Sequence, residues 1–483
     1  MKIKFINNHL LLKIIVLVLW AGCLLTINTN IVYLINFKPS IDYKLLDNIL
    51  IILNSLRFFF PFLIFVISII LIYIYNLKKI SLLIILFLLY ASWQALVFFY
   101  QSFYISRGYL LHVSEKANSL DTYQFILSLI ATVLTIHIAS YFKNLIYRKL
   151  LIMVLIFISF ISIYFSYKLV EEFFLNTDIT YLYSSKTLAV ESLLAFQALP
   201  RVTGVSRMLT LLFILLFLLF IRKKITKKKY LYFFILYLLF ILIYSMQSRG
   251  SFVGIIILLI SYIFFFKEEF IKKFIIIFIL FLTPIIFFEY FVKFKTIDNT
   301  SNNGKNRFFG NTKNIKTLEE KNTKVDVITS GRSIIWKRAI EIIVKEKIVI
   351  GYGPQADRYI FTKDLKLGVN TQKYHENLLF WDSNVSNAFL YSYLCGGFIG
   401  LCLLIIIYFL TIKEIYTAIK IEKNFFNNSL LYNFSLVTLI YLSARCLFEN
   451  SIALFSLDFC IYVVTYFIVK ENNKKKIFKS SFY

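Results

Sequence analysis

Arginine residues in a few short polar segments are the part of this sequence best suited to chemistry. Arg249 lies in the stretch QSRGSFVG, between two strongly apolar runs, and Arg332 lies in SGRSIIWKRA. Arg201 and Arg207 lie together in the segment PRVTGVSR, and Arg358 follows the turn GYGP. A guanidinium group can form paired hydrogen bonds with phosphate oxygens, and its charge stabilises negative charge that develops on them. These residues predict a site for a phosphate or pyrophosphate group.

Arg249 also has a purely structural explanation. An arginine at a membrane interface can cap a helical hairpin with its charge among the lipid headgroups, at little energetic cost. Gly250 and Gly254 follow it, spaced for close approach by a neighbouring helix or a ligand. The other arginines favour the phosphate interpretation, because lysine dominates the loops predicted on the opposite side of the membrane.

A second polar constellation lies near the C-terminus. Arg445 and Glu449 are one helical turn apart, and Asp458 on the following span should reach a similar depth in the membrane. The pattern predicts an internal ion-pair network. It leaves open the alternative that Arg445 orients a substrate-binding group.

The elements that must position these residues are membrane-spanning helices. Of the 483 residues, 59% are hydrophobic, only 14 are glycine and 5 are proline, and the mean hydropathy is +0.75. Apolar runs of roughly 17 to 25 residues, the length that spans a bilayer, predict an all-α polytopic membrane protein with about twelve spans. These predicted spans cover residues 10–29, 55–75, 80–100, 123–142, 150–170, 207–221, 230–248, 251–266, 274–292, 387–411, 430–448 and 452–469.

The distribution of charge predicts the orientation in the membrane. Lysine-rich loops and both termini fall on one side, which the positive-inside rule assigns to the cytoplasm. The net charge of +27 is therefore largely a topology signal and does not indicate nucleic acid as a partner. The cytoplasmic loops are too short for a nucleotide-binding domain, and the five cysteines lie in predicted spans without a metal-ligand pattern. No metal or cofactor is expected.

The longest polar segment, residues 293–386, lies on the extracytoplasmic side of this predicted topology. Apolar residues recur at helical spacing from Ser333 onward and predict an amphipathic helix, which ends at the turn Gly351 to Pro354. The chain is accordingly divided into residues 1–206 with the first five spans, 207–292 with the next four, the long loop 293–386, and 387–483 with the last three spans and a basic tail.

Five motifs follow one another along the second half of the chain: QSRGSFVG, GRSIIWKRA, GYGP, SNAFL and GGFIG. This series resembles the O-antigen polymerase and ligase superfamily over about residues 200–470. Members carry an SRG-like stretch, a long periplasmic loop with a GRxxxW helix and a GxG turn, and a polar residue followed by Asn before a GxxG helix.

The resemblance implies a C-type glycosyltransferase of the bacterial inner membrane that acts at the periplasmic face, without metal or cofactor. Its substrate would be an undecaprenyl-pyrophosphate-linked oligosaccharide, and Arg249 and Arg332 would act as catalytic cations on the leaving pyrophosphate. Membrane lipids, a flippase and a chain-length regulator are further candidate partners. The candidate substrate-binding residues are Arg201, Arg207, Gly250, Gly353, Arg358, Ser386, Asn387 and Arg445.

One position departs from the ligase pattern. Ligases usually have a histidine directly before the asparagine of the SNAFL-like motif, and here that residue is Ser386. Serine cannot replace histidine as a base at neutral pH. His375 and Asp382, in the loop just before it, are then the candidate catalytic bases.

The missing histidine favours a polymerase, which joins lipid-linked repeat units, over a ligase, which transfers the glycan to lipid A core or another acceptor. A flippase or transporter for the same lipid-linked oligosaccharide is the alternative from a different class, although the two halves of the chain show no convincing repeat. A scaffold protein whose outer loop binds a partner is a further alternative.

Overall fold

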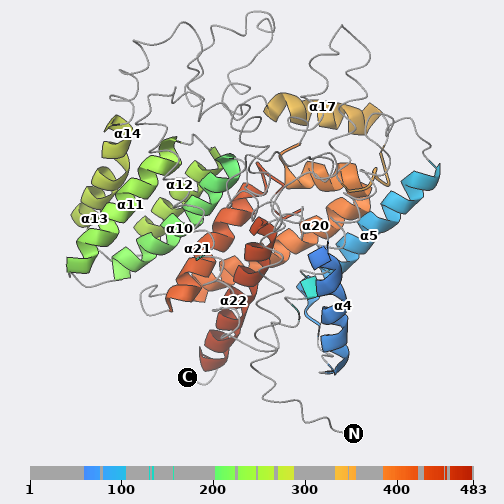
Figure 1. Cartoon of the computed structure of the whole chain (residues 1–483), viewed down its shortest axis with the longest axis horizontal. Helices are drawn as coiled ribbons and strands as arrows, with labels where there is room; N and C mark the ends of the chain where they lie inside the picture. Colours follow the sequence, from blue (N-terminus) through green and yellow to red (C-terminus); the bar gives the residue numbers. More distant parts are fainter. Residues whose placement is uncertain are drawn as a thin grey trace, which may run out of the picture. The chain divides into compact units, whose positions relative to one another are not determined.

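The computed structural model describes a helical protein (Figure 1). Apart from a few isolated positions, the described residues are 59–74, 80–104, 202–222, 227–245, 249–265, 270–287, 332–345, 348–354, 385–421, 429–450 and 457–480. Within these ranges every regular element is a helix, which confirms the all-α prediction for this part of the chain. The spans predicted at 10–29, 123–142 and 150–170 lie outside the described residues, save for single positions.

The helices overlap the predicted apolar runs, but those at Ala388–Ile421 and Leu457–Ser480 continue well past the predicted ends at residues 411 and 469. The helices are α4 Phe59–Ile74, α5 Leu82–Tyr104, α10 Val202–Arg222, α11 Lys227–Ser245, α12 Arg249–Phe265, α13 Phe270–Ile277, η2 Phe278–Leu282, α14 Thr283–Phe287, α17 Arg332–Lys345, α20 Ala388–Ile421, α21 Leu430–Arg445 and α22 Leu457–Ser480. Among the described residues, Leu82–Tyr100 and Ala388–Ile421 are long and apolar enough to cross a membrane, and several shorter apolar helices accompany them. The total of twelve spans stays a prediction.

The chain forms two compact units, and both are discontinuous in sequence. Unit 1 consists of Met1–Leu150, Thr323–Lys413 and Arg445–Val464, and unit 2 consists of Leu151–Asn322, Glu414–Ala444 and Thr465–Tyr483. Helices α20, α21 and α22 contribute residues to both units. The four sequence segments predicted above are a division along the chain and stay a prediction.

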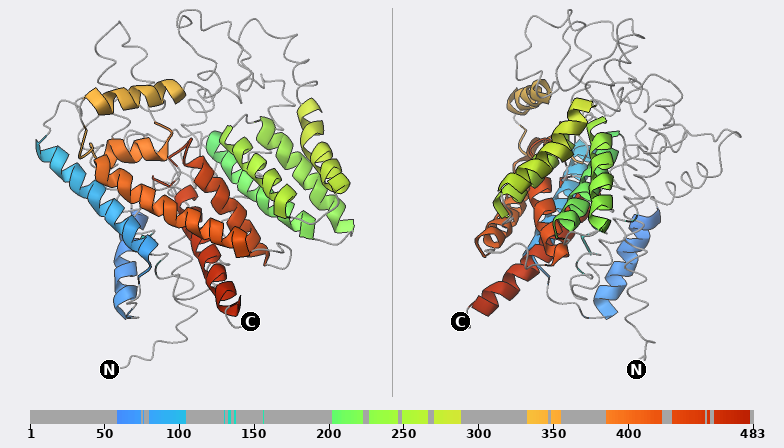
Figure 2. Two further views of the ribbon diagram at one scale, coloured as in Figure 1. Left: turned by 180° about the vertical axis from the view of Figure 1, so that it is seen from behind. Right: turned by 90° about the vertical axis from the view of Figure 1, so that its left-hand side faces the viewer.

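In unit 2, helices α10, α11 and α12 and the continuous α13–η2–α14 helix lie side by side (green to yellow in Figures 1 and 2). Their common core is aromatic. Phe281 lies 4.9 Å from Phe240 and 5.7 Å from Phe213, measured between ring centroids, and all three rings are buried. The π-helical turn η2 carries Phe281 into this cluster.

In unit 1, the long helix α20 is broken near its first third. Gly397 has φ 61° and ψ −156°, a conformation open essentially to glycine alone, and Figure 1 shows the resulting bend. The sequence predicted a span over residues 387–411, and the structure adds a kink inside it, at the Gly396–Gly397 pair.

Candidate functional site

The segment that follows α17 binds to the break in α20. Three backbone hydrogen bonds join them: Tyr352 N–H to Leu394 O (2.9 Å), Gly353 N–H to Cys395 O (2.8 Å) and Phe398 N–H to Val349 O (3.0 Å). A broken helix leaves carbonyl and amide groups without their usual partners, and burying them unpaired would be costly. Residues 349–353 satisfy them. We call these paired segments, 349–353 and 394–398, the backbone clasp.

Glycines make this close approach possible. Gly351, Gly353 and Gly397 all have positive φ angles, of 92°, 94° and 61°. A Cβ atom on Gly397 would lie 2.0 Å from Val349 O, and one on Gly351 would lie 2.5 Å from Gly397 N. Gly353 therefore has a structural reason to be glycine, and its predicted role in substrate binding stays a prediction.

Helix α17 has the amphipathic character predicted from Ser333 onward. Ala339 and Ile342 are buried, whereas Lys337, Glu341 and Lys345 are exposed. Arg332 is the first residue of this helix. A cation is unusual at that end of a helix, where the unpaired N–H groups already create positive potential.

Trp336, one turn after Arg332, anchors α17 to the start of α20. Its indole Nε1–H donates to Val385 O at 2.7 Å, and its ring lies 6.3 Å from that of Phe448. Ser386 follows Val385 and has φ 49°, a left-handed conformation that is uncommon for a residue other than glycine. The hydrogen bond from Trp336 thereby holds α17, the helix that begins at Arg332, against the backbone next to Ser386.

Asn387 connects the first turn of α20 to the turn that follows α21. Its side-chain oxygen accepts hydrogen bonds from the N–H groups of Phe389 and Leu390, both at 3.0 Å, as an N-cap residue does. Its side-chain Nδ2–H donates to Leu447 O at 2.9 Å, and the Ala388 N–H donates to Cys446 O at 3.0 Å. These contacts give Asn387 a structural function, and its predicted contact with substrate stays a prediction.

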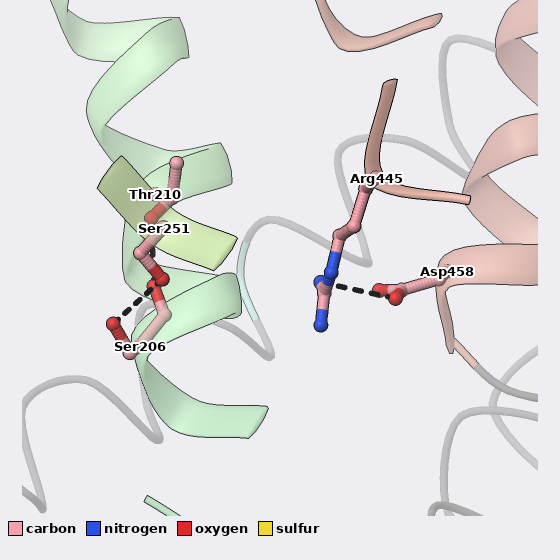
Figure 3. Close-up of polar contacts among 5 residues, drawn as sticks. All are labelled: Ser206, Thr210, Ser251, Arg445 and Asp458. Carbon is pink, nitrogen blue, oxygen red and sulfur yellow. Dashed lines mark hydrogen bonds and ion pairs between the residues drawn. The ribbon is translucent and has the colours of Figure 1, made fainter. Parts of the chain in front are cut away.

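The predicted ion pair near the C-terminus is present. Arg445 Nη1 lies 3.1 Å from Asp458 Oδ2, and the two side chains are 2% and 4% exposed (Figure 3). Helix α21 ends at Arg445, so Glu449 lies in the following turn, where its N–H donates to Arg445 O at 2.8 Å. Glu449 is half-buried.

In unit 2, hydroxyl groups and a glycine bring three helices together. Ser206 on α10 donates to Ser251 on α12 at 2.7 Å between the two Oγ atoms (Figure 3). A Cβ atom on Gly254 would lie 2.7 Å from Cγ2 of Thr210 on α10 and 2.8 Å from Cε2 of Tyr441 on α21. The close helix approach predicted at Gly254 is therefore confirmed.

The remaining predicted site residues divide into two groups. Arg249 and Gly250 open α12, and Arg207 lies half-buried in α10. The predicted site residues outside the described part of the chain are Arg201, Arg358, His375 and Asp382. The motif GGFIG was part of the predicted series, but the break of α20 at its glycine pair was not predicted. The signal for this break was a pair of glycines inside an apolar run.

Residues 234–405 match the family model described as O-antigen ligase, a region that runs from α11 into α20. It contains Arg249, Arg332, the backbone clasp and Asn387. None of the curated proteins compared with the chain matches it.

The match supports the resemblance deduced from the motifs. Residues 234–405 are similar to this family of membrane proteins, in agreement with the resemblance to the O-antigen polymerase and ligase superfamily. This family indicates a glycosyltransferase-like enzyme that acts on a lipid-linked glycan as a ligase or polymerase.

Proposed function

We propose that this protein is a polymerase that joins undecaprenyl-pyrophosphate-linked oligosaccharide repeat units at the periplasmic face of the bacterial inner membrane. The family match over residues 234–405 carries the proposal, because it includes both Arg249 and Arg332. The presence of Ser386 where ligases usually have histidine favours the polymerase within that family.

The proposed reaction is an attack by a sugar hydroxyl on the anomeric carbon of the donor glycan. The new glycosidic bond forms as the bond from that carbon to the pyrophosphate oxygen breaks, and the electron pair stays on the pyrophosphate. Cationic groups that contact this oxygen stabilise the transition state. No nucleotide or metal is invoked.

Arg249 and Arg332 are the proposed cations for this leaving group. Each is the first residue of its helix, α12 or α17. The N-terminal N–H groups of a helix repel a cation but bind phosphate oxygens well. An arginine at that position is therefore best explained if an anion binds there, and a pyrophosphate would accept hydrogen bonds from both the guanidinium group and the backbone.

The residue roles that the resemblance implied are also part of this proposal. His375 or Asp382 would serve as the base. The substrate would be lined by the remaining arginines, Gly250, Gly353, Ser386 and Asn387. The proposal also includes twelve spans, cytoplasmic termini, a periplasmic loop 293–386, and cooperation with a flippase and a chain-length regulator.

A ligase is the second candidate, because the matching family model is described as O-antigen ligase. Glycan analysis of a deletion strain distinguishes the two activities. Loss of a polymerase leaves single capped repeats on the cell surface. Loss of a ligase leaves an uncapped acceptor and long lipid-linked chains. An unchanged distribution of surface glycan lengths contradicts both activities.

The catalytic assignment is tested with purified protein and a synthetic lipid-linked repeat unit. We expect Arg249→Ala and Arg332→Ala each to lower the rate of chain elongation by about 100-fold or more. Lys272→Ala on α13 and Lys337→Ala on α17 are matched controls, because both lysines are exposed. Both controls should retain wild-type rates.

Two results would contradict this assignment. One is full activity in the folded arginine variants. The other is translocation of the lipid-linked oligosaccharide across vesicle membranes without any elongation or transfer, which would favour the transporter alternative.

A further inference from the structure

We infer that an exposed apolar strip on α17 and the backbone clasp is inserted into the membrane leaflet nearest the clasp. The strip consists of Ile340 and Val344 on α17 and of Val349 and Ile350 in the clasp. This inference goes beyond the proposed glycosyl transfer and does not depend on it. It assigns a lipid contact to a segment that the predicted topology places in a loop outside the spans.

The exposed half of α17 has two chemically different flanks. Ile340 and Val344, one turn apart, are 49% and 69% exposed. Glu341 and Lys345 follow them by one residue each, are also exposed, and lie about 100° further round the helix. Lys337 lies between the two flanks, where a long lysine side chain can reach past apolar surface to water. This separation suits a helix at the boundary between lipid and water.

Val349 and Ile350 extend the strip from α17 onto the clasp. They are 68% and 38% exposed. Two hydrogen bonds fix the chain just before them: Ile348 N–H donates to Ile343 O at 3.2 Å, and Tyr393 Oη–H donates to Ile348 O at 2.9 Å. The segment after α17 is thereby held against α20, so the strip has a defined position relative to that helix.

The strip adjoins the lipid-facing surface of α20. This helix is long and apolar enough to cross a membrane, and its residues Phe398 and Ile399 are 59% and 46% exposed. Exposed apolar side chains on a membrane span face lipid. Phe398 N–H donates to Val349 O at 3.0 Å, so the exposed Val349 lies directly beside this surface. The continuity between the two exposed apolar surfaces identifies membrane lipid as the occupant of the strip.

Insertion of the strip also holds the start of α17 close to the membrane. Arg332 begins α17 and lies about 12 Å along the helix axis from Ile340, at a rise of about 1.5 Å per residue. A lipid-linked substrate keeps its apolar chain in the membrane and its pyrophosphate at the membrane surface. The inserted strip therefore keeps Arg332 within reach of the layer in which such a pyrophosphate lies.

The test measures the membrane depth of single positions in the purified full-length protein, reconstituted in vesicles of phosphatidylethanolamine and phosphatidylglycerol. A nitroxide spin label is attached through Val344→Cys. Its collisions with oxygen, which concentrates in lipid, are compared with its collisions with a water-soluble nickel chelate. We expect oxygen to dominate, at a depth of about 5–10 Å into the boundary between headgroups and acyl chains. The signal of the unsubstituted protein, labelled in the same way, is subtracted because native cysteines remain.

Lys345→Cys is the matched control. Lys345 is exposed and follows Val344 directly, but it lies on the charged flank, so we expect collisions with the nickel chelate to dominate there. Ile340→Cys and Glu341→Cys form a second pair with the same relation. They cover the case in which a label at position 344 disturbs folding, and they should show the same contrast.

Three results overturn the inference. If labels at positions 340 and 344 collide mainly with the nickel chelate, the strip faces water. If both labels are shielded from oxygen and chelate alike, another segment of this chain or a second copy covers the strip. If oxygen dominates equally at position 345, the exposed half of α17 has no separate lipid-facing flank. The measurement needs no turnover, so a protein that fails to transfer the glycan leaves this inference intact.

Discussion

The two units hold their helices together by different means. In unit 1 the decisive contacts are backbone hydrogen bonds of the clasp, between segments about 40 residues apart in sequence, such as Gly353 N–H to Cys395 O. In unit 2 they are side-chain contacts, through the rings around Phe281 and the hydroxyls of Ser206 and Ser251. Backbone contact demands glycine at defined positions, whereas side-chain packing tolerates substitutes of similar volume.

This difference bears on the proposed site. Arg332 begins a helix whose far end leads directly into the clasp, and Asn387 opens the helix that the clasp interrupts. Unit 1 therefore fixes these functional candidates through the clasp, together with the side-chain hydrogen bonds of Trp336 and Asn387. We expect that substitutions in the clasp will impair activity and stability together, whereas those in the core of unit 2 will change stability in smaller steps.

The largest effect is expected for Gly397→Ala. The new Cβ atom would meet Val349 O at 2.0 Å, and alanine strongly disfavours the φ and ψ angles of this residue. The variant should lose about 4 kcal/mol or more of unfolding free energy, or fail to fold. Thermal unfolding in detergent, with the yield of folded protein, measures this loss.

Gly396→Ala is the matched control for that prediction. At this neighbouring residue a Cβ atom would come no closer than 3.4 Å, to Trp93 Cδ1. We expect a loss of about 1 kcal/mol or less. Equal stability of the two variants would show that the clasp does not require glycine at 397.

A smaller effect is expected for Gly254→Ala in unit 2. The Cβ atom would overlap Thr210 Cγ2 and Tyr441 Cε2, which are side-chain atoms that can shift. The cost should be about 2 kcal/mol, measured by chemical unfolding. Adding Thr210→Ser removes the Cγ2 methyl group and should restore part of this loss; no recovery would mean that Thr210 does not limit the approach of the helices.

Phe281→Leu probes the aromatic core of the same unit. Leucine keeps the site apolar but removes ring contacts with Phe213, Phe217 and Phe240, so we expect a loss of about 1 kcal/mol. The control is Phe278→Leu on the same π-helical turn, because Phe278 is 44% exposed. Calorimetry that shows equal destabilisation in both variants would argue against a core role for Phe281.

The smallest effect is expected at the hydroxyl pair. Hydrogen bonds between buried side chains in membrane proteins contribute about 0.6 kcal/mol on average. Ser206→Ala, Ser251→Ala and the double variant form a cycle that isolates this bond, which is 2.7 Å long. A coupling energy above about 2 kcal/mol would place this contact on a par with the clasp and remove the contrast between the units.

Much of the architecture could be predicted from local sequence. Apolar runs of the right length gave α5, α11 and α12 within a few residues, because a helix in lipid must satisfy its own backbone groups. The periodicity after Ser333 likewise predicted which face of α17 is buried. The pairing of Arg445 with Asp458 followed from their predicted depth, since a charge inside a membrane protein needs a partner.

Other features depended on contacts between distant segments. The break in α20 forms where the loop before it supplies hydrogen bonds to Leu394 and Cys395, and no pattern within α20 alone specifies that loop. The same holds for Asn387, which the motif comparison gave only as a candidate substrate-binding residue and which in the structure caps α20 and binds Leu447 O. No motif in the sequence predicts that Asn387 lies beside the turn that follows α21.

By itself, the sequence determined that the chain forms apolar helices, where most of the described helices begin, and which superfamily its motifs resemble, because these properties depend on composition and short-range spacing. Only the tertiary structure decided which backbone groups meet across the Gly397 break and that Asn387 binds the turn after α21. Such contacts join residues far apart in the chain, and they form only when folding brings those residues together.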